Sequence, residues 1–260
     1  MRYIHPDASI GENVTIEPFV TIGADVVIGD DTWIGPHVSI MDGVRIGKGC
    51  RIFPGAVVGA IPQDLKFKGE YSLVELGDRV TVREYVTLNR GTQASHRTTI
   101  GNDSLLMAYV HVAHDCHIGK HCVLANGVTL AGHIEVEEYA ILGGLTAVHQ
   151  FVKIGAHAFI GGGSLVRKDV PPYVKAAREP LSYAGINSVG LRRRGFRPED
   201  IHVIQDVYRI LFVKGYNTSQ AMEIIETDID ATPERDYILE FLRKADRGIM
   251  RGFQQMNNRR

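Results

Sequence analysis

The chain has 260 residues, of which 23% are charged, and its formal net charge at pH 7 is −1. This near-neutral balance excludes nucleic acid as the default partner, because a protein that binds polyanions carries a clear excess of basic residues. The sequence contains no run of about eighteen apolar residues, so we expect no stable membrane insertion. Since the N-terminus enters a repeat at once and shows no targeting pattern, we expect a cytoplasmic protein.

An apolar residue recurs at every sixth position along most of the first two thirds of the chain. Isoleucine fills each of these positions from Ile4 to Ile52, and the series continues to Val166. A period of six fits neither a helix nor an alternating strand that enters a hairpin, but it fits a parallel β-helix with one flat face per six residues. Glycine often follows the apolar residue, and we interpret it as a corner residue that supplies an unusual backbone angle.

The series is interrupted where polar and charged residues replace the inward aliphatic residue. These interruptions fall in residues 61–72 and 91–98, which we interpret as loops projecting from a β-helix domain of residues 1–170. Loops held by a rigid scaffold often carry function. The positions that break the series are Asp64, Glu70 and Ala94.

The rhythm ends after Val166, and different residue patterns follow. Pro171 and Pro172 cannot donate to a strand ladder, so residues 171–195 are expected to form a linker. The remaining residues, 196–260, are predicted to form a small α-helical domain. It would cover the last coil, because an open β-helix end needs a cap.

Three helices are predicted in that C-terminal domain. The first begins at Pro198 and the second near Thr218. The third has Thr232 as its N-cap and Pro233 as its first residue.

The six-residue repeat resembles that of the hexapeptide transferase family. The resemblance implies a mainly β fold, namely a left-handed parallel β-helix whose triangular coils each hold three six-residue units. The left hand is implied by the family alone, since ordinary parallel crossovers are right-handed. About eight coils would form a prism on the order of 40 Å tall.

A histidine-rich segment, residues 106–151, lies within this repeat. With three units to a coil, His114, Gly132 and Gln150 are predicted to stack on one outer face, and Asp115 to lie under His133. A histidine beside a glycine offers a general base next to a backbone that a substrate can approach. The segment therefore predicts an acyl-transfer site.

Six motifs narrow the resemblance to one family. They are IPQDLKFKGE (61–70), HVAHDC (111–116), LAGH (130–133), GGLTAVHQF (143–151), DVPPY (169–173) and INSVGLRRRGF (186–196). Together they resemble the UDP-N-acetylglucosamine O-acyltransferase family, which begins lipid A biosynthesis, and the resemblance covers nearly the whole chain.

The family resemblance implies a reaction and its partners. The reaction is transfer of an (R)-3-hydroxyacyl chain from acyl carrier protein to the 3-position of UDP-N-acetylglucosamine. The family forms a homotrimer with each groove between neighbouring prisms. We expect no bound cofactor, because the acyl donor arrives on the phosphopantetheine arm of the carrier protein.

The resemblance also implies the catalytic residues. His114 matches the catalytic histidine, which takes the proton from the sugar 3-hydroxyl as that oxygen attacks the thioester. Asp115 matches the residue that orients or polarises it, and the Gly132 N–H would receive the tetrahedral oxyanion. With an ordinary pKa of about 6.5, histidine suits this work near neutral pH.

Substrate-binding residues follow from the same motifs. Those matching the sugar and pantetheine groove are Asp64, His111, His133 and Gln150, and we add the neighbouring His149 to the substrate-binding residues. Those matching nucleotide and phosphate contacts are Gln63, Lys66, Asn187, Arg193 and Arg194. Gly162 matches the end of the acyl channel, where a glycine leaves room for a long chain. Val189 departs from the acidic residue that some members carry near the uridine.

Three other functions compete with this one. A zinc enzyme of the carbonic-anhydrase type uses the same prism, but His111, His114 and His117 lie in adjacent units that face different sides, so no metal site is expected. The N-acyltransferase of the same pathway carries an extra N-terminal domain, whereas this chain begins with repeats. A non-enzymatic scaffold gives no reason for His114 and Gly132 to share a column.

Overall fold

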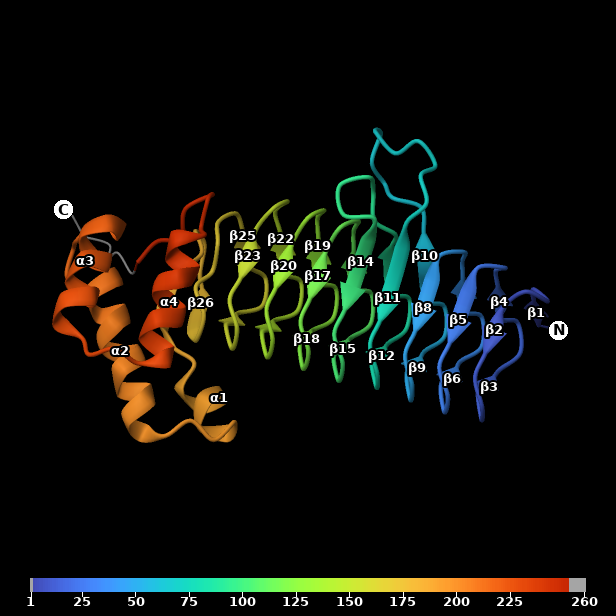
Figure 1. Cartoon of the computed structure of the whole chain (residues 1–260), viewed down its shortest axis with the longest axis horizontal. Helices are drawn as coiled ribbons and strands as arrows, with labels where there is room; N and C mark the ends of the chain where they lie inside the picture. The colour runs from blue at the N-terminus through green and yellow to red at the C-terminus, as the bar shows by residue number, and fades with distance from the viewer. Residues whose placement is uncertain (1, 253–260) are drawn as a thin grey trace.

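The computed structural model describes residues 2–252, which form a long β-prism with a helical cap at one end (Figure 1). Residues 253–260 of the predicted helical domain lie outside the described residues. The prism is a left-handed parallel β-helix, as the resemblance implies. Each coil contributes one short strand to each of three sheets, which contain nine, eight and ten strands.

The strands of each sheet follow one another along the prism. The first sheet contains β1 (Tyr3–Ile4), β4 (Thr21–Ile22), β7 (Ser39–Ile40), β10 (Val57–Ala60), β13 (Thr87–Asn89), β16 (His111–Val112), β19 (Thr129–Leu130), β22 (Ala147–Val148) and β25 (Leu165–Val166). The second contains β2 (Ser9–Ile10), β5 (Val26–Ile28), β8 (Val44–Ile46), β11 (Leu73–Leu76), β14 (Arg97–Ile100), β17 (His117–Ile118), β20 (Glu135–Val136) and β23 (Lys153–Ile154). The third contains β3 (Thr15–Ile16), β6 (Trp33–Ile34), β9 (Arg51–Ile52), β12 (Thr81–Val82), β15 (Leu105–Leu106), β18 (Val123–Leu124), β21 (Ile141–Leu142), β24 (Phe159–Ile160), β26 (Val174–Ala177) and β27 (Ser182–Ile186).

The register explains why the apolar series forms a core. His111 pairs with Thr129, eighteen residues later, so a coil holds three six-residue units. Every sixth residue therefore points inward on one of the three faces, directly above its counterpart in the previous coil. Ile22 and Ile40, which pair in this way, are at most 1% exposed. The interior is a set of aliphatic ladders, and its burial provides the main stabilisation of the prism.

Two loops interrupt the coils in whole units of six. Val57 pairs with Thr87, so that coil has 87 − 57 = 30 residues and the first loop adds twelve. Leu73 pairs with Arg97, so 97 − 73 = 24 and the second loop adds six. Both loops project from the same side of the prism (Figure 1). The second loop is shorter than expected, because Arg97 and Thr98 already belong to β14.

The recurring glycines were predicted to supply an unusual backbone angle, and this reason is wrong. Most of these glycines do not have a positive φ; left-handed corner positions are instead held by residues such as Asp115 and His133, with φ values of 57° and 60°. A Cβ added to Gly29 would lie 2.7 Å from the backbone of Gly47 in the next coil. Glycine is required there because successive coils approach closely.

Residues 171–195, expected as a linker, instead continue the fold. Pro171 and Pro172 precede a turn, where no ladder N–H is needed, and β26 then pairs in parallel with β24. The strand β27 returns antiparallel to β26, and the short helix α1 (Ser188–Arg193) follows. The ladder therefore resumes after the two prolines.

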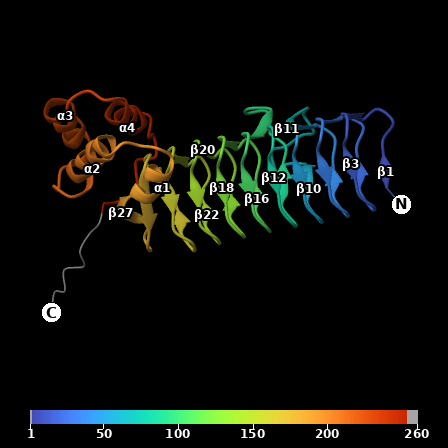
Figure 2. The same ribbon diagram turned by 90° about the horizontal axis from the view of Figure 1, so that it is seen from below.

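Three longer helices form the cap, at the end of the prism opposite the N-terminus (Figure 2). They are α2 (Pro198–Phe212), α3 (Thr218–Asp228) and α4 (Pro233–Arg243), and each begins where its residues predict. The Thr232 side chain accepts a hydrogen bond from the Arg235 N–H at 3.1 Å, as an N-cap does. None of the helices among residues 2–252 combines the length and apolar character that crossing a bilayer requires.

The cap is joined to the last coil by buried tyrosines. The hydroxyl of Tyr208, which is fully buried in α2, donates to the Pro172 carbonyl at 2.6 Å. Tyr208→Phe should lower the free energy of unfolding by about 1–3 kcal/mol, because it leaves that buried carbonyl unsatisfied. Chemical denaturation would measure the loss, and Tyr216→Phe, at an exposed position, should be neutral. Equal stability of both variants would contradict this role.

Candidate functional site

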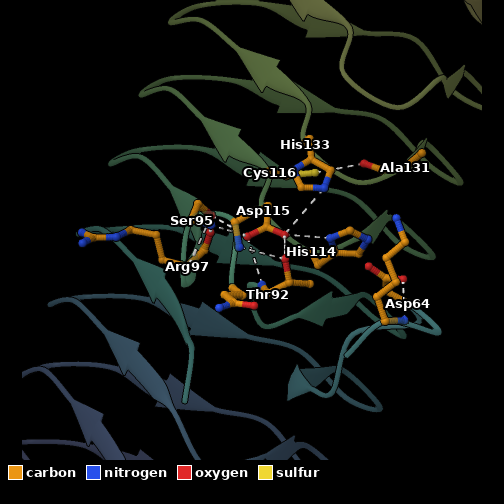
Figure 3. A network of polar contacts seen from close by, with 12 residues as sticks. Asp64, Thr92, Ser95, Arg97, His114, Asp115, Cys116, Ala131 and His133 are labelled. Carbon is orange, nitrogen blue, oxygen red and sulfur yellow. Dashed lines mark hydrogen bonds and ion pairs between the residues drawn. The ribbon is translucent and has the colours of Figure 1, made fainter. Parts of the chain in front are cut away.

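His114 and Asp115 lie in the turn between β16 and β17, at the edge where the first and second sheets meet. In a strand, adjacent side chains would point to opposite faces. Here the left-handed backbone of Asp115 turns the two side chains toward each other, so that His114 Nδ1 lies 2.8 Å from Asp115 Oδ2 (Figure 3). We call this edge, with residues 114–115, 132–133 and 150–151, the histidine edge.

The second loop surrounds the Asp115 carboxylate with donors. Oδ1 accepts hydrogen bonds from the Thr92 N–H at 3.0 Å, the Ser95 N–H at 3.2 Å and the Ser95 hydroxyl at 2.5 Å. Oδ2 accepts from the Thr92 hydroxyl at 2.6 Å and from His114. Burial alone would raise the pKa of Asp115, but the hydrogen bonds from Ser95, Thr92 and His114 outweigh it and hold the pKa well below its usual range. Asp115 is therefore a carboxylate.

An ionised Asp115 determines which nitrogen of His114 carries the proton. Nδ1 donates to the carboxylate, so in the neutral ring Nε2 carries the free lone pair. The His114 side chain is 9% exposed, and its ring lies between Asp115 and Asp64 of the first loop (Figure 3). This arrangement suits a general base that takes a proton at Nε2.

Gly132 stacks on His114, as the spacing of eighteen predicts. A Cβ on Gly132 would lie 2.5 Å from His114 Cε1 and 2.7 Å from Nε2, so only glycine lets the ring lie against this backbone. The Gly132 N–H has no hydrogen-bond partner within residues 2–252. It is free to donate to a ligand.

His133 and Phe151 continue the histidine edge above Asp115. The His133 ring meets that of His114 edge-on, with 5.0 Å between centroids, and His133 Nε2 is 3.9 Å from Asp115 Oδ2. The Phe151 ring stacks on the His133 ring, with 4.5 Å between the centroids and 13° between the ring planes. Burial lowers the pKa of His133, which favours its neutral form. Asp115 therefore lies under His133, as predicted.

A cavity of about 650 Å³ opens beside His114, between the first loop and the histidine edge. Six predicted residues line it: Gln63, Asp64, Lys66, His114, His133 and Gln150. The sequence did not identify six others: Leu65, Glu70, Thr92, Gln93, Ala94 and Phe151. Glu70 links the two loops, since its carboxylate accepts from the backbone N–H groups of Lys68 and Gln93.

The remaining predicted substrate-binding residues lie outside this cavity in the single chain. They are His111, His149, Gly162, Asn187, Arg193 and Arg194. His111 Nδ1 is 2.7 Å from the Thr87 hydroxyl, and burial lowers the pKa of His111. His149 Nδ1 lies 3.2 Å from the Gln150 carbonyl oxygen, next to the cavity.

Asn187 and Arg194 lie at a different edge, between the second and third sheets. We call it the tyrosine edge, because His121, Tyr139, His157 and Tyr173 stack along it. The buried Asn187 amide donates to the His157 carbonyl at 3.0 Å, and Asn187 also caps α1. Arg194 donates to the Tyr139 carbonyl at 3.1 Å. One chain therefore does not bring these residues to His114.

His157 on the tyrosine edge makes stability depend on pH. Burial and the nearby Arg194 guanidinium lower the pKa of His157 to about 4. An unfolded histidine binds its proton below about pH 6.5, whereas the folded one does so only near 4, so the free energy of unfolding should fall as the pH drops between these values. His157→Phe should flatten this slope in thermal melts from pH 7 to 4.5. His202→Phe, at an exposed position in α2, should keep it; equal slopes in all three proteins would refute the assignment.

One group of residues in the described chain has the ligand atoms to hold a metal, namely His114, Asp115 and His133. It is not the group of His111, His114 and His117 considered from the sequence. The Asp115 carboxylate already accepts five hydrogen bonds, and its two oxygens offer about four lone-pair directions. This carboxylate is saturated by donors, which favours an orienting role over metal ligation.

Comparison with known proteins gives consistent matches along the chain. Residues 169–250 match the family model described as Udp N-acetylglucosamine O-acyltransferase, Domain 2, and residues 25–60 and 97–132 match that of the bacterial transferase hexapeptide repeat. The acyl-(acyl-carrier-protein)–UDP-N-acetylglucosamine O-acyltransferase of Chlorobaculum parvum is 60% identical over 255 residues, covering 95% of this chain and 97% of that protein. The protein of the same name from Chlorobium phaeobacteroides is 65% identical over 246 residues, covering 94% of this chain and 92% of that protein.

A solved structure is also closely similar. The UDP-N-acetylglucosamine acyltransferase of Bacteroides fragilis superimposes with a TM-score of 0.94 and 51% sequence identity. The match covers 96% of this chain and 98% of that chain, so it spans the prism and the helical cap.

Proposed function

Because the chain belongs to the UDP-N-acetylglucosamine O-acyltransferase family, we propose that it transfers an (R)-3-hydroxyacyl chain from acyl carrier protein to the 3-hydroxyl of UDP-N-acetylglucosamine, the first step of lipid A biosynthesis. One observation carries the proposal. The His114 imidazole, held at Nδ1 by an ionised Asp115, stands at the wall of a cavity of about 650 Å³, a volume in the usual range of small-molecule sites.

In the proposed reaction, His114 acts as general base. Its Nε2 takes the proton of the sugar 3-hydroxyl as that oxygen attacks the thioester carbon. The C–S bond then breaks, and the imidazolium returns the proton to the leaving thiolate of the carrier protein. Asp115 orients the ring and stabilises the imidazolium.

The Gly132 N–H is proposed to bind the oxyanion of the tetrahedral intermediate. Gly132 lies against the His114 ring, and its N–H has no partner among residues 2–252; both observations support this role. A preorganised backbone donor is effective because it needs no reorganisation as charge develops.

The substrates are proposed to occupy the cavity and its surroundings. Asp64, His133 and Gln150 line the cavity and would contact the sugar and the pantetheine arm, with His111 and His149 beside them. Gln63 and Lys66 of the first loop would reach the nucleotide. Gly162 would leave the acyl channel open, and a Cβ there would lie 3.0 Å from the Gly144 carbonyl oxygen.

We also propose that the active unit is a homotrimer whose sites combine two chains. The separation of the tyrosine edge from the histidine edge supports this, since Asn187, Arg193 and Arg194 would then serve the cavity of a neighbouring chain. These polar and cationic groups suit the phosphates of a nucleoside diphosphate. Val189, exposed in α1, supplies no acidic contact to the uridine.

Mixed trimers provide a direct prediction of shared sites. His114→Ala and Arg193→Ala should each be inactive alone. After co-refolding in equal amounts, about a quarter of the sites should combine an intact His114 with an intact Arg193 and regain activity. Mixtures no more active than the separate variants would contradict a site built from two chains.

The function itself is tested with purified protein, UDP-N-acetylglucosamine and a series of 3-hydroxyacyl carrier proteins of increasing chain length. Formation of the 3-O-acyl product is expected, and no product with any donor would refute the proposal. The analogue with an amine at C3 is the second acceptor; preference for it would favour the N-acyltransferase. A chelator should leave the rate unchanged, whereas loss of activity restored by zinc would favour the metal enzyme.

A further inference from the structure

The segment after α4 returns to the prism and brings a cation to the histidine edge. We propose that Arg247 is a positioning residue for acyl transfer, acting on His114 through the coil edge that lies above it. The inference rests on the proposed function, and Arg247 is not proposed to touch the reacting atoms.

The backbone around Arg247 is fixed to the last coils on both sides. The Asp169 N–H donates to the Gly248 carbonyl at 3.2 Å, and the Asp169 carbonyl accepts from the Met250 N–H at 2.9 Å. On the other side, the Lys153 ammonium donates to the Lys244 carbonyl at 3.3 Å. The segment is therefore held in place rather than loosely attached.

From this position Arg247 contacts the histidine edge. Its guanidinium donates to the Gln150 carbonyl at 2.9 Å, across 97 residues of sequence. The guanidinium carbon also lies 5.9 Å from the centroid of the Phe151 ring. Both contacts are to the coil that lies directly above Gly132 and His133.

A chain of peptide groups leads from Arg247 to His114. The Gln150 carbonyl and the Phe151 N–H belong to the same peptide group. This N–H donates to the Gly132 carbonyl at 3.2 Å. The next peptide in the column has the His133 N–H, which donates to the His114 carbonyl at 3.0 Å. Hydrogen bonds aligned in this way strengthen one another, and the charge of Arg247 stands at the head of the chain.

The aromatic rings provide a second route. Phe151, which Arg247 contacts, stacks on His133, and the His133 ring meets that of His114. Arg247 therefore fixes the position and orientation of the Phe151 and His133 rings, and the His133 ring in turn contacts that of His114. Because small displacements of a general base slow a reaction strongly, loss of Arg247 should appear in turnover.

The arginine is exposed, so its contribution to folding should be small, and activity and stability can be separated. Arg247→Met should lower kcat about 10-fold, while KM for both substrates stays within about twofold and the melting temperature is unchanged. Arg247→Lys keeps a charge and a donor and should recover most of kcat. Arg243→Met is the matched control: it lies four residues earlier in the cap and pairs with Glu226.

Two kinetic results would overturn the inference. One is an Arg247→Met enzyme with wild-type kcat; the other is a loss of kcat that follows a lowered melting temperature and that lysine does not restore. If Arg247 only stabilised the fold, its replacement would leave the NMR signals of the histidine rings unchanged. We expect these signals of ¹⁵N-labelled protein to shift in Arg247→Met and not in Arg243→Met. Unchanged signals would also count against it. An inactive wild-type enzyme would instead refute the proposed function.

Discussion

Replacing His114 by alanine is expected to lower the rate of acyl transfer by about 10²- to 10⁴-fold, which is the usual contribution of a general base. The ring lies on Gly132 and bonds to Asp115, so its removal takes away the base and leaves the prism core intact. The measurement is kcat/KM with UDP-N-acetylglucosamine and a 3-hydroxyacyl carrier protein, together with the oligomeric state of the variant.

The matched control for His114 is His37→Ala. This histidine belongs to the same repeat but stacks on Phe19 where the third and first sheets meet, away from both the histidine edge and the tyrosine edge, and its loss should change the rate little. If His114→Ala assembles normally and loses only twofold, His114 is not the general base.

Replacing Asp115 by asparagine is expected to lower kcat by about 10²- to 10⁴-fold at almost unchanged volume. The carboxylate holds the proton on His114 Nδ1, and an amide can present its NH₂ to the ring and favour the wrong tautomer. The same NH₂ would face the hydroxyl donor of Thr92, so the variant should also lose about 1–3 kcal/mol of stability. Steady-state kinetics and chemical denaturation measure the two effects.

The lowered pKa of Asp115 adds a pH signature to this variant. Because the folded pKa lies below the unfolded value of about 4, the stabilisation by the carboxylate is complete above that pH and is lost as the pH falls toward the folded pKa. The stability difference between wild type and Asp115→Asn should therefore be constant at neutral pH and shrink in acid.

The control for Asp115 is Asp206→Asn, which removes an exposed ion pair with Arg209 in α2. It should leave kcat unchanged. A kcat of Asp115→Asn within fivefold of wild type would show that the carboxylate does not govern the histidine.

The sequence alone determined the prism and the place of the site along it. A six-residue apolar period predicts a parallel β-helix, and the family resemblance implies its left hand and its three units per coil. Eighteen residues per coil then bring His114 and Gly132 together. The loops were visible for the same reason, since polar residues interrupt an otherwise continuous ladder. Helix starts followed from local signals at Pro198 and Thr232.

Local patterns misled where backbone geometry depends on contacts with the next coil. The recurring glycines are required by close approach between coils, and a single chain pattern does not distinguish that from an unusual φ. Pro171 and Pro172 suggested an end to the ladder, yet they stand where no N–H is needed and β26 pairs beyond them.

Only the tertiary structure decided how the site is assembled. The left-handed turn at Asp115 directs two adjacent side chains toward each other, and the second loop places Thr92 and Ser95 around the carboxylate. It also put Asn187 on another edge and brought Arg247 to Gln150. These contacts join residues from separate coils, loops and the cap, and such long-range geometry depends on how the whole chain closes on itself, which no local spacing encodes.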